Sequence, residues 1–445
     1  MDKKMIYAVV VVVILVVAAV GVYAVVNDDN GSDHGTPAEM DNAALKVYGN
    51  INGDRYLNSD DATLIQQLID EGHTAEEYPL ADANRDGILN SDDVAVVNAV
   101  VNGASTTLWH INYHDINGDG IMDEEVVSTK YPISSVIMTA STNMSITMFS
   151  LGIVDEVKGA TYSSSLDDAL FGDNYLDTDK VVRLGTSSTS ITFEDGRAGS
   201  SDVIAQQGVT AVLTDWNRTY ITNEADFENA NIDVVRISAA AVDEETLTHS
   251  VMLIGLLFQK VDRAESYLDL CMEVLNYVDS SITQDSLPKV VASSMTGYLS
   301  STGSDYTQAV LRAGAEYGIP DVSFGGSTSL QIEDHPEVYQ YDFSYIIHLR
   351  SGLDYGQTAE SNAELVTTCT TPFSDWRYAD SGQYIVSGMI PPVLRVAYAA
   401  YAMHSDSINL DAVNELHQRF VDQFYNGLDI DVSSMKFVIT PEDMA

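Results

Sequence analysis

Two short loops of one pattern, at residues 50–61 and 82–93, constrain the fold of this chain more than any other feature. The first reads N-I-N-G-D-R-Y-L-N-S-D-D and the second reads D-A-N-R-D-G-I-L-N-S-D-D. Oxygen-bearing side chains stand at loop positions 1, 3, 5, 9 and 12 in both. This spacing wraps a short backbone around one hard cation and surrounds it with oxygen ligands, as Ca²⁺ prefers. The sequence therefore predicts two calcium sites.

The predicted calcium ligands are side-chain oxygens, together with the backbone carbonyl at position 7. They are Asn50, Asn52, Asp54, Tyr56, Asn58 and Asp61 in the first loop, and Asp82, Asn84, Asp86, Ile88, Asn90 and Asp93 in the second. Asn50 replaces the first carboxylate, and Arg55 stands where the second loop has the turn glycine Gly87. A lower affinity is predicted for the first loop. The alternative is a pair of acidic surface turns that bind nothing.

Each loop is followed by a stretch with apolar residues three and four positions apart, which predicts one amphipathic helix. Gly72 and Gly103 follow these stretches and suit helix C-caps. The duplicated loop–helix unit resembles a dockerin module over residues 47–104. This resemblance implies two calcium ions that fold the module and a cohesin domain as partner. It also implies partner contacts at positions 10 and 11, which are Ser59, Asp60, Ser91 and Asp92.

A third fragment of the loop pattern follows at residues 115–123. Its candidate calcium ligands are Asp115, Asn117, Asp119 and Asp123. Alternating residues on both sides read as strands, so residues 105–132 are predicted to form a β-hairpin connector. Whether its turn holds a third calcium ion or is a bare turn stays open.

The N-terminal segment is apolar from Met5 to Val26, long enough to cross about 30 Å of hydrocarbon. Lys3 and Lys4 precede it and aspartates follow it, which predicts a cytoplasmic N-terminus. Residues 1–26 are therefore predicted to be a single-pass transmembrane anchor, with the bulk of the chain extracellular. A cleaved signal peptide is the alternative. The polar, Gly- and Asp-rich residues 27–46 are predicted to be a flexible linker.

The net charge of −45 argues against nucleic acid and other polyanions as partners. There are only two cysteines, Cys271 and Cys369, too few for a disulfide framework. Cys271 sits on an apolar helix stripe, which favours two buried thiols, and a disulfide bond between them stays the alternative.

From residue 133 onward, short apolar strands alternate with helices, which predicts an α/β fold with parallel sheets. One long helical pattern interrupts this alternation. The sequence thus predicts two Rossmann-like lobes, at 133–260 and 289–445, joined by a spanning helix within 261–288. The small helical calcium-loop module and the transmembrane helix precede them.

This arrangement resembles the class III ABC-transporter solute-binding proteins of the siderophore- and cobalamin-binding type. The likeness rests on the order of several segments, namely S-L-G-I-V-D-E-V-K-G at 150–159, 201–213, N-I-D-V-V at 231–235, and I-G-L-L-F-Q-K at 254–260. It implies an ABC permease as partner and a chelated metal, such as an iron–siderophore or a corrinoid, as cargo. By position, Glu156 and Glu333 are candidates for permease contacts.

Loops after the predicted strands supply the candidate ligand residues, because ligands of such folds lie at the carboxyl ends of strands. They are Asn143, Trp216, Arg218, Tyr220, Tyr298, His348, Arg350, Trp376, Arg377 and Tyr378. A Trp beside an Arg occurs twice and suits an anionic or conjugated ligand. The alternative is that these are surface loops with a structural Trp.

Two other functions compete with solute binding. One is a calcium-dependent surface protein that docks to a cohesin-type partner. The other is an enzyme, but the chain has neither a G-x-S-x-G nor an H-E-x-x-H motif. We therefore expect a binding protein without catalytic residues.

Overall fold

The computed structural model describes residues 40, 44–139, 142–161, 181–186, 189–197, 202–282, 287–325, 327–350, 353, 355, 359–425 and 427–444. All of them belong to one compact unit, Pro37–Ala445. Among these residues no helix is both long and apolar enough to cross a membrane. The predicted anchor at 1–26 and most of the predicted linker lie outside the described residues.

One helix follows each of the first two loops. They are α2 (Ser59–Glu71) and α3 (Ser91–Val101), and they pack against each other. Both begin with the same capping box, in which the N-cap Asn58 or Asn90 is paired with the aspartate three residues later. Gly72 ends α2 with φ +79°, a left-handed conformation that favours glycine. The local sequence alone thus accounts for both helices.

The hairpin consists of β1 (Thr106–His114) and β2 (Asp123–Tyr131), paired antiparallel. It packs beside β7 (Asp233–Ile237), the edge strand of the first lobe. The buried Asn112 makes this contact: its Nδ2 donates to the Val234 carbonyl at 2.9 Å, and its Oδ1 accepts from the Arg236 amide at 2.9 Å. One amide side chain therefore satisfies two backbone groups at an edge that would otherwise be unpaired.

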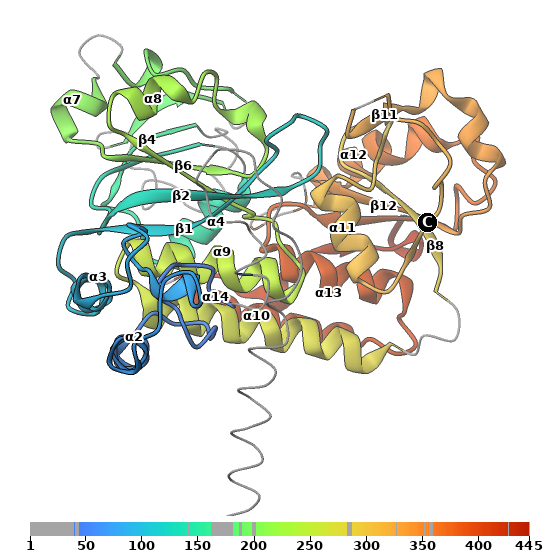
Figure 1. The fold of residues 1–445 in the computed structure, drawn as a ribbon. Coiled ribbons are helices and arrows are strands. Elements are labelled where there is room, and N and C mark those ends of the chain that lie inside the picture. Colours follow the sequence, from blue (N-terminus) through green and yellow to red (C-terminus); the bar gives the residue numbers. More distant parts are fainter. Residues whose placement is uncertain are drawn as a thin grey trace, which may run out of the picture. The chain divides into compact units, whose positions relative to one another are not determined.

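The first lobe is a parallel sheet in the order β5-β4-β3-β6-β7 (Figure 1). The other strands are β3 (Val136–Met138), β4 (Val157–Thr161), β5 (Val182–Gly185) and β6 (Ala211–Asp215). Its helices are α4 (Thr142–Ser150), α7 (Val203–Gln207) and α8 (Ala225–Asn229). Strands β3 and β6 are buried along their whole length, as expected for a parallel sheet covered on both faces.

The second lobe has the sheet order β10-β8-β12-β13-β14, parallel except for the antiparallel pair β13–β14. Its strands are β8 (Lys289–Ser293), β10 (Glu316–Tyr317), β12 (Tyr345–Arg350), β13 (Gln383–Ser387) and β14 (Val438–Ile439). Its helices are α11 (Asp305–Arg312), α12 (Ala359–Thr370), α13 (Pro392–Met403), α14 (Leu410–Phe424) and α15 (Pro441–Met444). Strands β9 (Tyr298–Ser300) and β11 (Ser329–Gln331) form a separate antiparallel pair.

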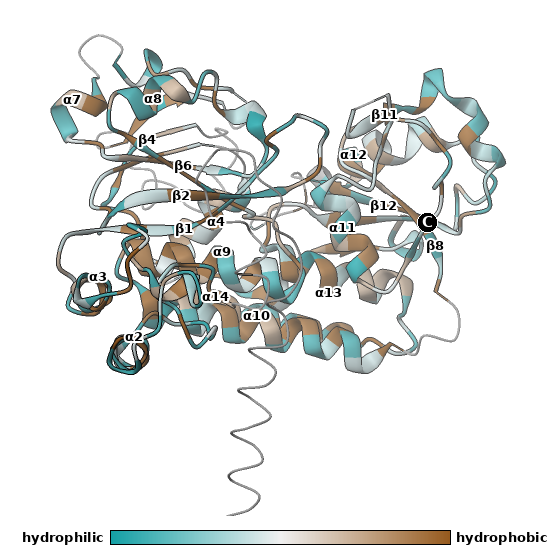
Figure 2. Cartoon of the chain, in the orientation of Figure 1, coloured by the Kyte–Doolittle hydropathy of each residue, from teal (hydrophilic) through white to brown (hydrophobic). Residues whose placement is uncertain are grey.

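Two helices connect the lobes. The helix α9 (Glu244–Leu257) leads into α10 (Val261–Ser281), which packs against α9, α13 and α14. The buried residues of α10 are Ala264, Tyr267, Leu268, Leu270, Cys271, Val274, Leu275 and Val278. In Figure 2, α13 is mainly hydrophobic, whereas α10 alternates between hydrophobic and hydrophilic colours. The predicted spanning helix is thus present, and Cys271 and Cys369 are buried free thiols.

The calcium-loop module is packed onto the lobes and shares their core. Ile65 of α2 and Val97 of α3 are fully buried in the same apolar cluster as residues of α9 and α10. Arg55 donates to Asp269 of α10 at 2.8 Å and to Glu265 at 3.1 Å. The residue that replaces the turn glycine of the first loop therefore binds the module to the spanning helix.

We predict that Ile65→Ala lowers the free energy of unfolding of the whole protein by about 2–5 kcal/mol, since it leaves a cavity in this shared core. Urea unfolding followed by tryptophan fluorescence measures the change. The control is Gln67→Ala on the exposed side of the same helix. Equal stability of both variants would show that the module does not contribute to the common core.

Candidate functional site

A cavity of about 350 Å³ opens between the two lobes. The first lobe lines it with Trp216, Thr246 and the segment Ser238–Asp243, of which residues 238 and 240–243 contribute. The second lobe contributes Thr302, Gly303, Asp305, Gln308 and Arg312, and the hairpin tip contributes Gly120 and Met122. A volume of this size suits a small ligand. Three parts of the chain that are distant in sequence therefore meet around one cavity.

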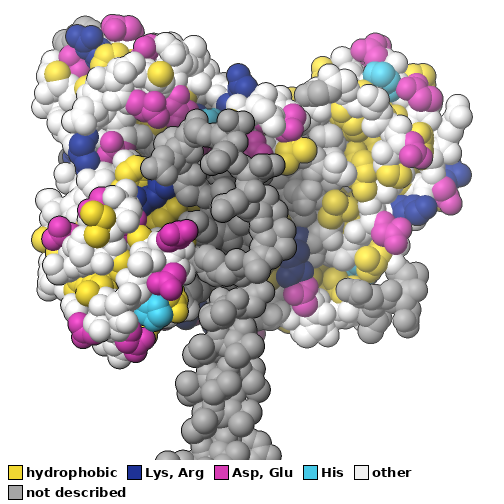
Figure 3. Space-filling view, in the orientation of Figure 1, with side chains coloured by type: hydrophobic (Ala, Val, Ile, Leu, Met, Phe, Trp, Pro, Cys, Tyr) yellow, Lys and Arg dark blue, Asp and Glu magenta, His cyan; other side chains and the backbone are white. Residues whose placement is uncertain are grey.

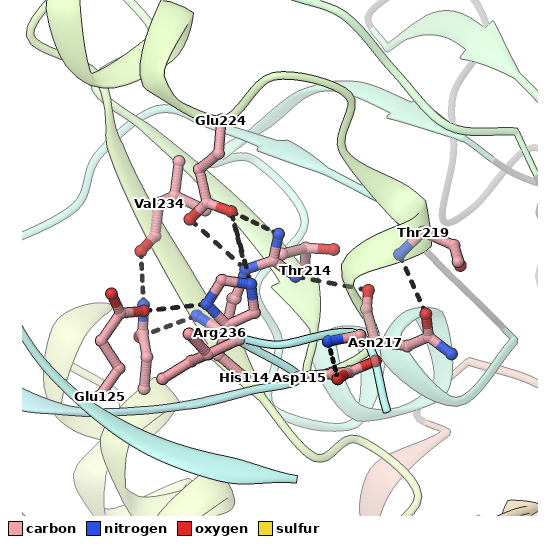
Figure 4. A network of polar contacts seen from close by, with 12 residues as sticks. His114, Asp115, Glu125, Thr214, Asn217, Thr219, Glu224, Val234 and Arg236 are labelled. Atoms are coloured by element: carbon pink, nitrogen blue, oxygen red, sulfur yellow. Dashed lines mark hydrogen bonds and ion pairs between the residues drawn. The ribbon is translucent and has the colours of Figure 1, made fainter. Parts of the chain in front are cut away.

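The loop after β6 carries Asp215 and Trp216 and is held by a buried arginine. Arg236 is 1% exposed, pairs with Glu224, and donates from Nη1 to the Asp215 carbonyl at 3.0 Å (Figure 4). The hairpin supports the same loop, since the Asp115 amide donates to the Trp216 carbonyl at 3.0 Å. The conformation of this cleft loop thus depends on strand β7 and on the hairpin together.

Two carboxyl groups from opposite lobes influence each other at the cleft. Asp215 ends β6 and is 5% exposed, and Asp305 begins α11 and is half-buried. Burial and the neighbouring charge of Asp305 raise the pKa of Asp215 above its ordinary value. Burial also raises the pKa of Asp305, although Arg395 opposes that shift. Asp305 lines the cavity, whereas Asp215 lies directly before the lining residue Trp216.

Arg395 and Asn143 form a second contact between the lobes. Arg395 lies in α13 of the second lobe and donates to Oδ1 of Asn143, which lies in α4 of the first lobe. Both side chains are buried. Arg395 also donates to the Ile390 carbonyl at 2.9 Å, and its guanidinium lies 5.6 Å from the ring centroid of Tyr306. This hydrogen bond ties the lobes together in the conformation described here.

Of the predicted ligand residues, Trp216 lines the cavity, whereas the prediction is wrong for Asn143, Arg218, Tyr220, Tyr298 and Arg350, which are not among the lining residues. Asn143 contacts Arg395, and the pKa of Tyr220 is raised by burial and by the charges of Asp215 and Asp305. Arg218 belongs to the same loop, but its guanidinium packs over Gly118 in the hairpin turn. Arg350 ends β12 and donates to Thr296 at 3.0 Å, and its Nη1 is buried with no hydrogen-bond partner among the described residues. Tyr298 donates to Gln331 at 3.1 Å in the β9–β11 pair.

The structure does not bring Trp376, Arg377 and Tyr378 to the cavity. These residues precede β13, so they lie at the amino end of a parallel strand and not at the carboxyl end where ligands bind. Trp376 is 2% exposed and stacks on Phe343, and Arg377 pairs with Asp342. This second Trp–Arg cluster is a structural tryptophan with a surface ion pair, the alternative that the sequence left open.

His348 also lies inside the second lobe and not among the cavity residues. It is 1% exposed and shares a hydrogen bond of 2.9 Å with Gln383. Burial lowers its pKa to about 4. Because β12 is buried on both faces, period-2 alternation could not show which way its side chains point.

The three calcium-type loops share one internal hydrogen-bond pattern. In each, the side-chain oxygen at position 3 accepts from the amide at position 5, and the carboxylate at position 5 accepts from the amide at position 7. The carboxylate of Asp61 or Asp93 closes the first two loops by accepting from an amide at position 3. In the hairpin turn the carboxylate of Asp123 accepts from the amide at position 2, that of Ile116, at 3.3 Å. The predicted ligands are therefore gathered within each loop.

The first two loops also contain buried polar side chains. Asp61 and Asp93 are fully buried, and burial raises the pKa of both, with a further contribution from neighbouring aspartates. Asn50 is fully buried, and its Oδ1 has no hydrogen-bond partner in the part of the chain that the structure describes. These features fit a bound cation. In the described ranges, there is no cluster of three or more His, Cys, Asp or Glu side chains that could hold a metal ion. A cation in these loops would therefore also need asparagine and backbone oxygens as ligands.

The sequence did not predict that Asp305 and the hairpin tip line the cavity or that Arg395 connects the lobes. Asp305 stands at the first position of a helix, which is a common place for an acidic residue, and Arg395 falls within an apolar helix. In the sequence, only the position of Arg395 within an apolar stretch could have indicated a buried charged residue.

We predict that His348 makes the folded protein less stable as the pH falls from 6.5 towards 4. In that range the unfolded chain binds a proton at this histidine and the folded chain does not. Between pH 7 and pH 5, the free energy of unfolding of the wild type should therefore fall by about 2 kcal/mol more than that of His348→Gln. Urea unfolding measures both. His335→Gln, at an exposed histidine, is the control. An unchanged pH slope in His348→Gln would contradict the buried neutral state.

Comparison with protein-family models finds no match, and no curated protein matches the sequence. Solved structures do match. A TroA-like periplasmic binding protein FepB from Veillonella parvula has a TM-score of 0.53 at 16% identity, over 71% of this chain and 97% of that one. The molybdate periplasmic binding protein MolA of Haemophilus influenzae, bound to molybdate, has a TM-score of 0.51 at 12% identity, over 69% of this chain and 98% of that one.

These likenesses show the fold alone. Almost the full length of each of these proteins is matched, whereas more than a quarter of this chain has no counterpart in either. The unmatched share is close to what the residues before 133 make up. The chain has the two-lobed α/β fold with a long connecting helix that TroA-like periplasmic binding proteins have.

Proposed function

We propose that this protein is the solute-binding component of an ABC importer and that it captures a chelated metal, such as an iron–siderophore or a corrinoid, outside the cell. The observation that carries this proposal is the cavity between two parallel-sheet lobes joined by α10. FepB is described as a periplasmic binding protein, and MolA as one cognate to an ABC transporter. The protein would be held at the membrane by its N-terminal segment, would present its cargo to a permease, and would catalyse no reaction.

Closure of the lobes around the cargo is the expected mechanism. The rigid helix α10 packs on helices of both lobes, so it favours a small hinge movement over a wide one. Cargo would replace contacts that the lobes now make with each other, such as the hydrogen bond from Arg395 to Asn143. The cleft loop with Trp216 would supply a flat aromatic surface for stacking.

We predict that Trp216→Ala weakens cargo binding at least about tenfold, because Trp216 is the large aromatic side chain in the cavity lining. Isothermal titration calorimetry with haemin, cyanocobalamin and ferric chelates of the hydroxamate and catecholate types first identifies a binder. The matched control is Tyr378→Ala, an exposed aromatic residue at the opposite end of the second-lobe sheet. The assignment of the cleft fails if both variants bind as the wild type does.

We further propose that the first two loops bind Ca²⁺ and that the hairpin turn is a third candidate site. The buried Oδ1 of Asn50 and the buried carboxylates of Asp61 and Asp93 support this proposal. Bound calcium would neutralise those carboxylates and hold each loop in its curled form. Because the module shares the core of the lobes, calcium would stiffen the protein and not only the module.

Docking to a cohesin-type partner is the second candidate function. The residues at positions 10 and 11 of both loops, Ser59, Asp60, Ser91 and Asp92, are exposed. The inner faces of α2 and α3 are packed in the core that they share with α9 and α10, so a partner would have to use these outer residues. Binding of a cohesin domain that is abolished by changing both Ser–Asp pairs would support this second function.

We predict that Asp93→Asn removes one calcium-binding event, because it takes one carboxylate oxygen from the closing position of the second loop. Calorimetric titration with CaCl₂ after chelator treatment gives the stoichiometry. Asp92→Asn is the matched control, since Asp92 is exposed and adjacent. Wild-type protein that binds no calcium, or Asp93→Asn with undiminished stoichiometry, would refute the assignment.

A further inference from the structure

The tip of the hairpin forms part of the wall of the cavity between the lobes. Gly120 and Met122 line this cavity, together with Trp216 of the first lobe and with Thr302 and Gly303 of the second. In Figure 1 the hairpin, drawn in teal, extends from the first lobe towards the second. The cavity is therefore enclosed by a third element in addition to the two lobes.

The hairpin tip comes into contact range of the second lobe. A side chain at Gly303 would begin 3.7 Å from the carbonyl oxygen of Gly120, which is an ordinary van der Waals distance. Gly303 lies in the loop between β9 and α11. The hairpin thus bridges the gap between the lobes at this point, and cargo cannot occupy the space that the hairpin backbone fills.

The hairpin tip is fixed to the first lobe by apolar packing. Met122 and the cleft residue Trp216 pack against one apolar cluster, which contains the buried Ile111 and Tyr113 of β1. The amide of Asp115 also donates to the carbonyl of Trp216 at 3.0 Å. Because these contacts join the tip to the cleft loop, the tip moves with the first lobe when the lobes separate.

The hairpin turn is also packed closely against the cleft loop. A Cβ atom at Gly118 would lie 2.5 Å from Nη1 of Arg218, which is too close for any side chain larger than hydrogen. The backbone of Gly118, with φ +78°, favours glycine as well. The turn therefore has no room to retreat from the cavity in the direction of Arg218.

The cavity lining differs in character from the outer surface. Acidic side chains are spread over the visible faces of both lobes in Figure 3, in keeping with the net charge of −45. Most of the lining residues, in contrast, are small and uncharged, such as Ser238, Ala240 and Thr246. The large apolar side chains in the lining are Met122 and Trp216. These two side chains and the nearby backbone therefore determine the space that cargo can use.

The size of the cavity restricts the cargo that it can hold. Its volume of about 350 Å³ is near the lower end of the range for small-molecule sites, about 300–1,000 Å³. A metal ion surrounded by separate small chelators suits such a space, whereas a macrocyclic siderophore complex or a corrinoid is much larger. Since α10 favours a small hinge movement, the lobes cannot separate widely to admit the larger complexes.

We infer that the hairpin tip is a built-in size limit, which restricts the cargo to compact metal chelates and excludes bulky ones such as corrinoids. This inference rests on the proposed solute-binding function and narrows its class of cargo. A bulky chelate would have to displace Met122 and separate Gly120 from Gly303, and overfilling a packed site in this way is unfavourable.

The test compares two uncharged ferric hydroxamates of the same coordination chemistry and different size on the calcium-loaded full-length protein. Ferric tris(acetohydroxamate) is the compact probe, and the macrocyclic ferrioxamine E is the bulky one, with cyanocobalamin as a second bulky probe. Calorimetry measures their binding to the wild type and to a short-turn variant, in which an Asn-Gly turn replaces residues 115–122. A two-residue turn fits between His114 and Asp123, which are paired in the hairpin.

Met122→Ala is the second variant, because it removes only a lining side chain and keeps the loop with its candidate calcium ligands. It separates an effect of size from an effect of calcium. Ile121→Ala is the matched control, since Ile121 is adjacent, 64% exposed and not among the lining residues.

We expect the wild type to bind the compact hydroxamate about tenfold or more tightly than ferrioxamine E, because the bulky complex overfills the cavity. The short-turn variant and Met122→Ala should both bind the bulky probes more tightly than the wild type does, and Ile121→Ala should not. A bulky probe that binds the short-turn variant alone also supports the inference.

Two results would overturn the inference and leave the solute-binding function intact. One is a bulky probe that binds the wild type at least as tightly as the compact hydroxamate does. The other is a short-turn variant and a Met122→Ala variant that discriminate by size as the wild type does. Failure of every probe, and of the wider panel of metal chelates, to bind the wild type or either variant would overturn both the inference and the proposed function.

Discussion

The burial of one face of α10 is the constraint on which the rest of the structure depends. This helix packs against α9 on the first lobe and against α13 and α14 on the second, through residues such as Tyr267, Cys271 and Val278. Each lobe needs α10 to cover its apolar surface, so neither can move far without exposing it. The spacing of the lobes, and with it the cavity between them, follows from this shared packing. The calcium-loop module adds to it, because Arg55 binds the outer side of the same helix.

The cleft itself depends on polar groups that are costly to bury. Arg236 is buried, and its charge is compensated by Glu224 and by the carbonyl of Asp215. Removing either partner of such a pair leaves an uncompensated charge, so the loop with Trp216 is held in one conformation. Asp115 of the hairpin holds the same loop from the other side. The hairpin thus lines the cavity between the lobes as well as connecting the module to them.

Local patterns in the sequence predicted the elements that depend on neighbours along the chain. The two loop–helix units follow from the spacing of oxygen-bearing residues and from the caps at Asn58 and Asn90. The long apolar stripe of α10 also stood out. Short elements were missed, because β10 and β14 each have two residues and carry no periodicity. Helix α11 ends at Arg312, and Gly314 with φ +86° then turns the chain into β10.

The candidate site was predictable only where it lies in a loop directly after a strand, as Trp216 does. Trp376 also has an arginine close by in sequence but precedes its strand, and the direction of the strand places it at the amino end of the sheet. The sequence by itself determined the calcium-type loops, the helices and the two-lobed order of elements, since these depend on residues a few positions apart. Only the tertiary structure decided that Asp243 and Asp305 from opposite lobes line one cavity and that Arg312 beside them is paired with Asp279. Which charged groups are paired depends on contacts between segments that are distant in sequence, and a local sequence pattern cannot predict these contacts.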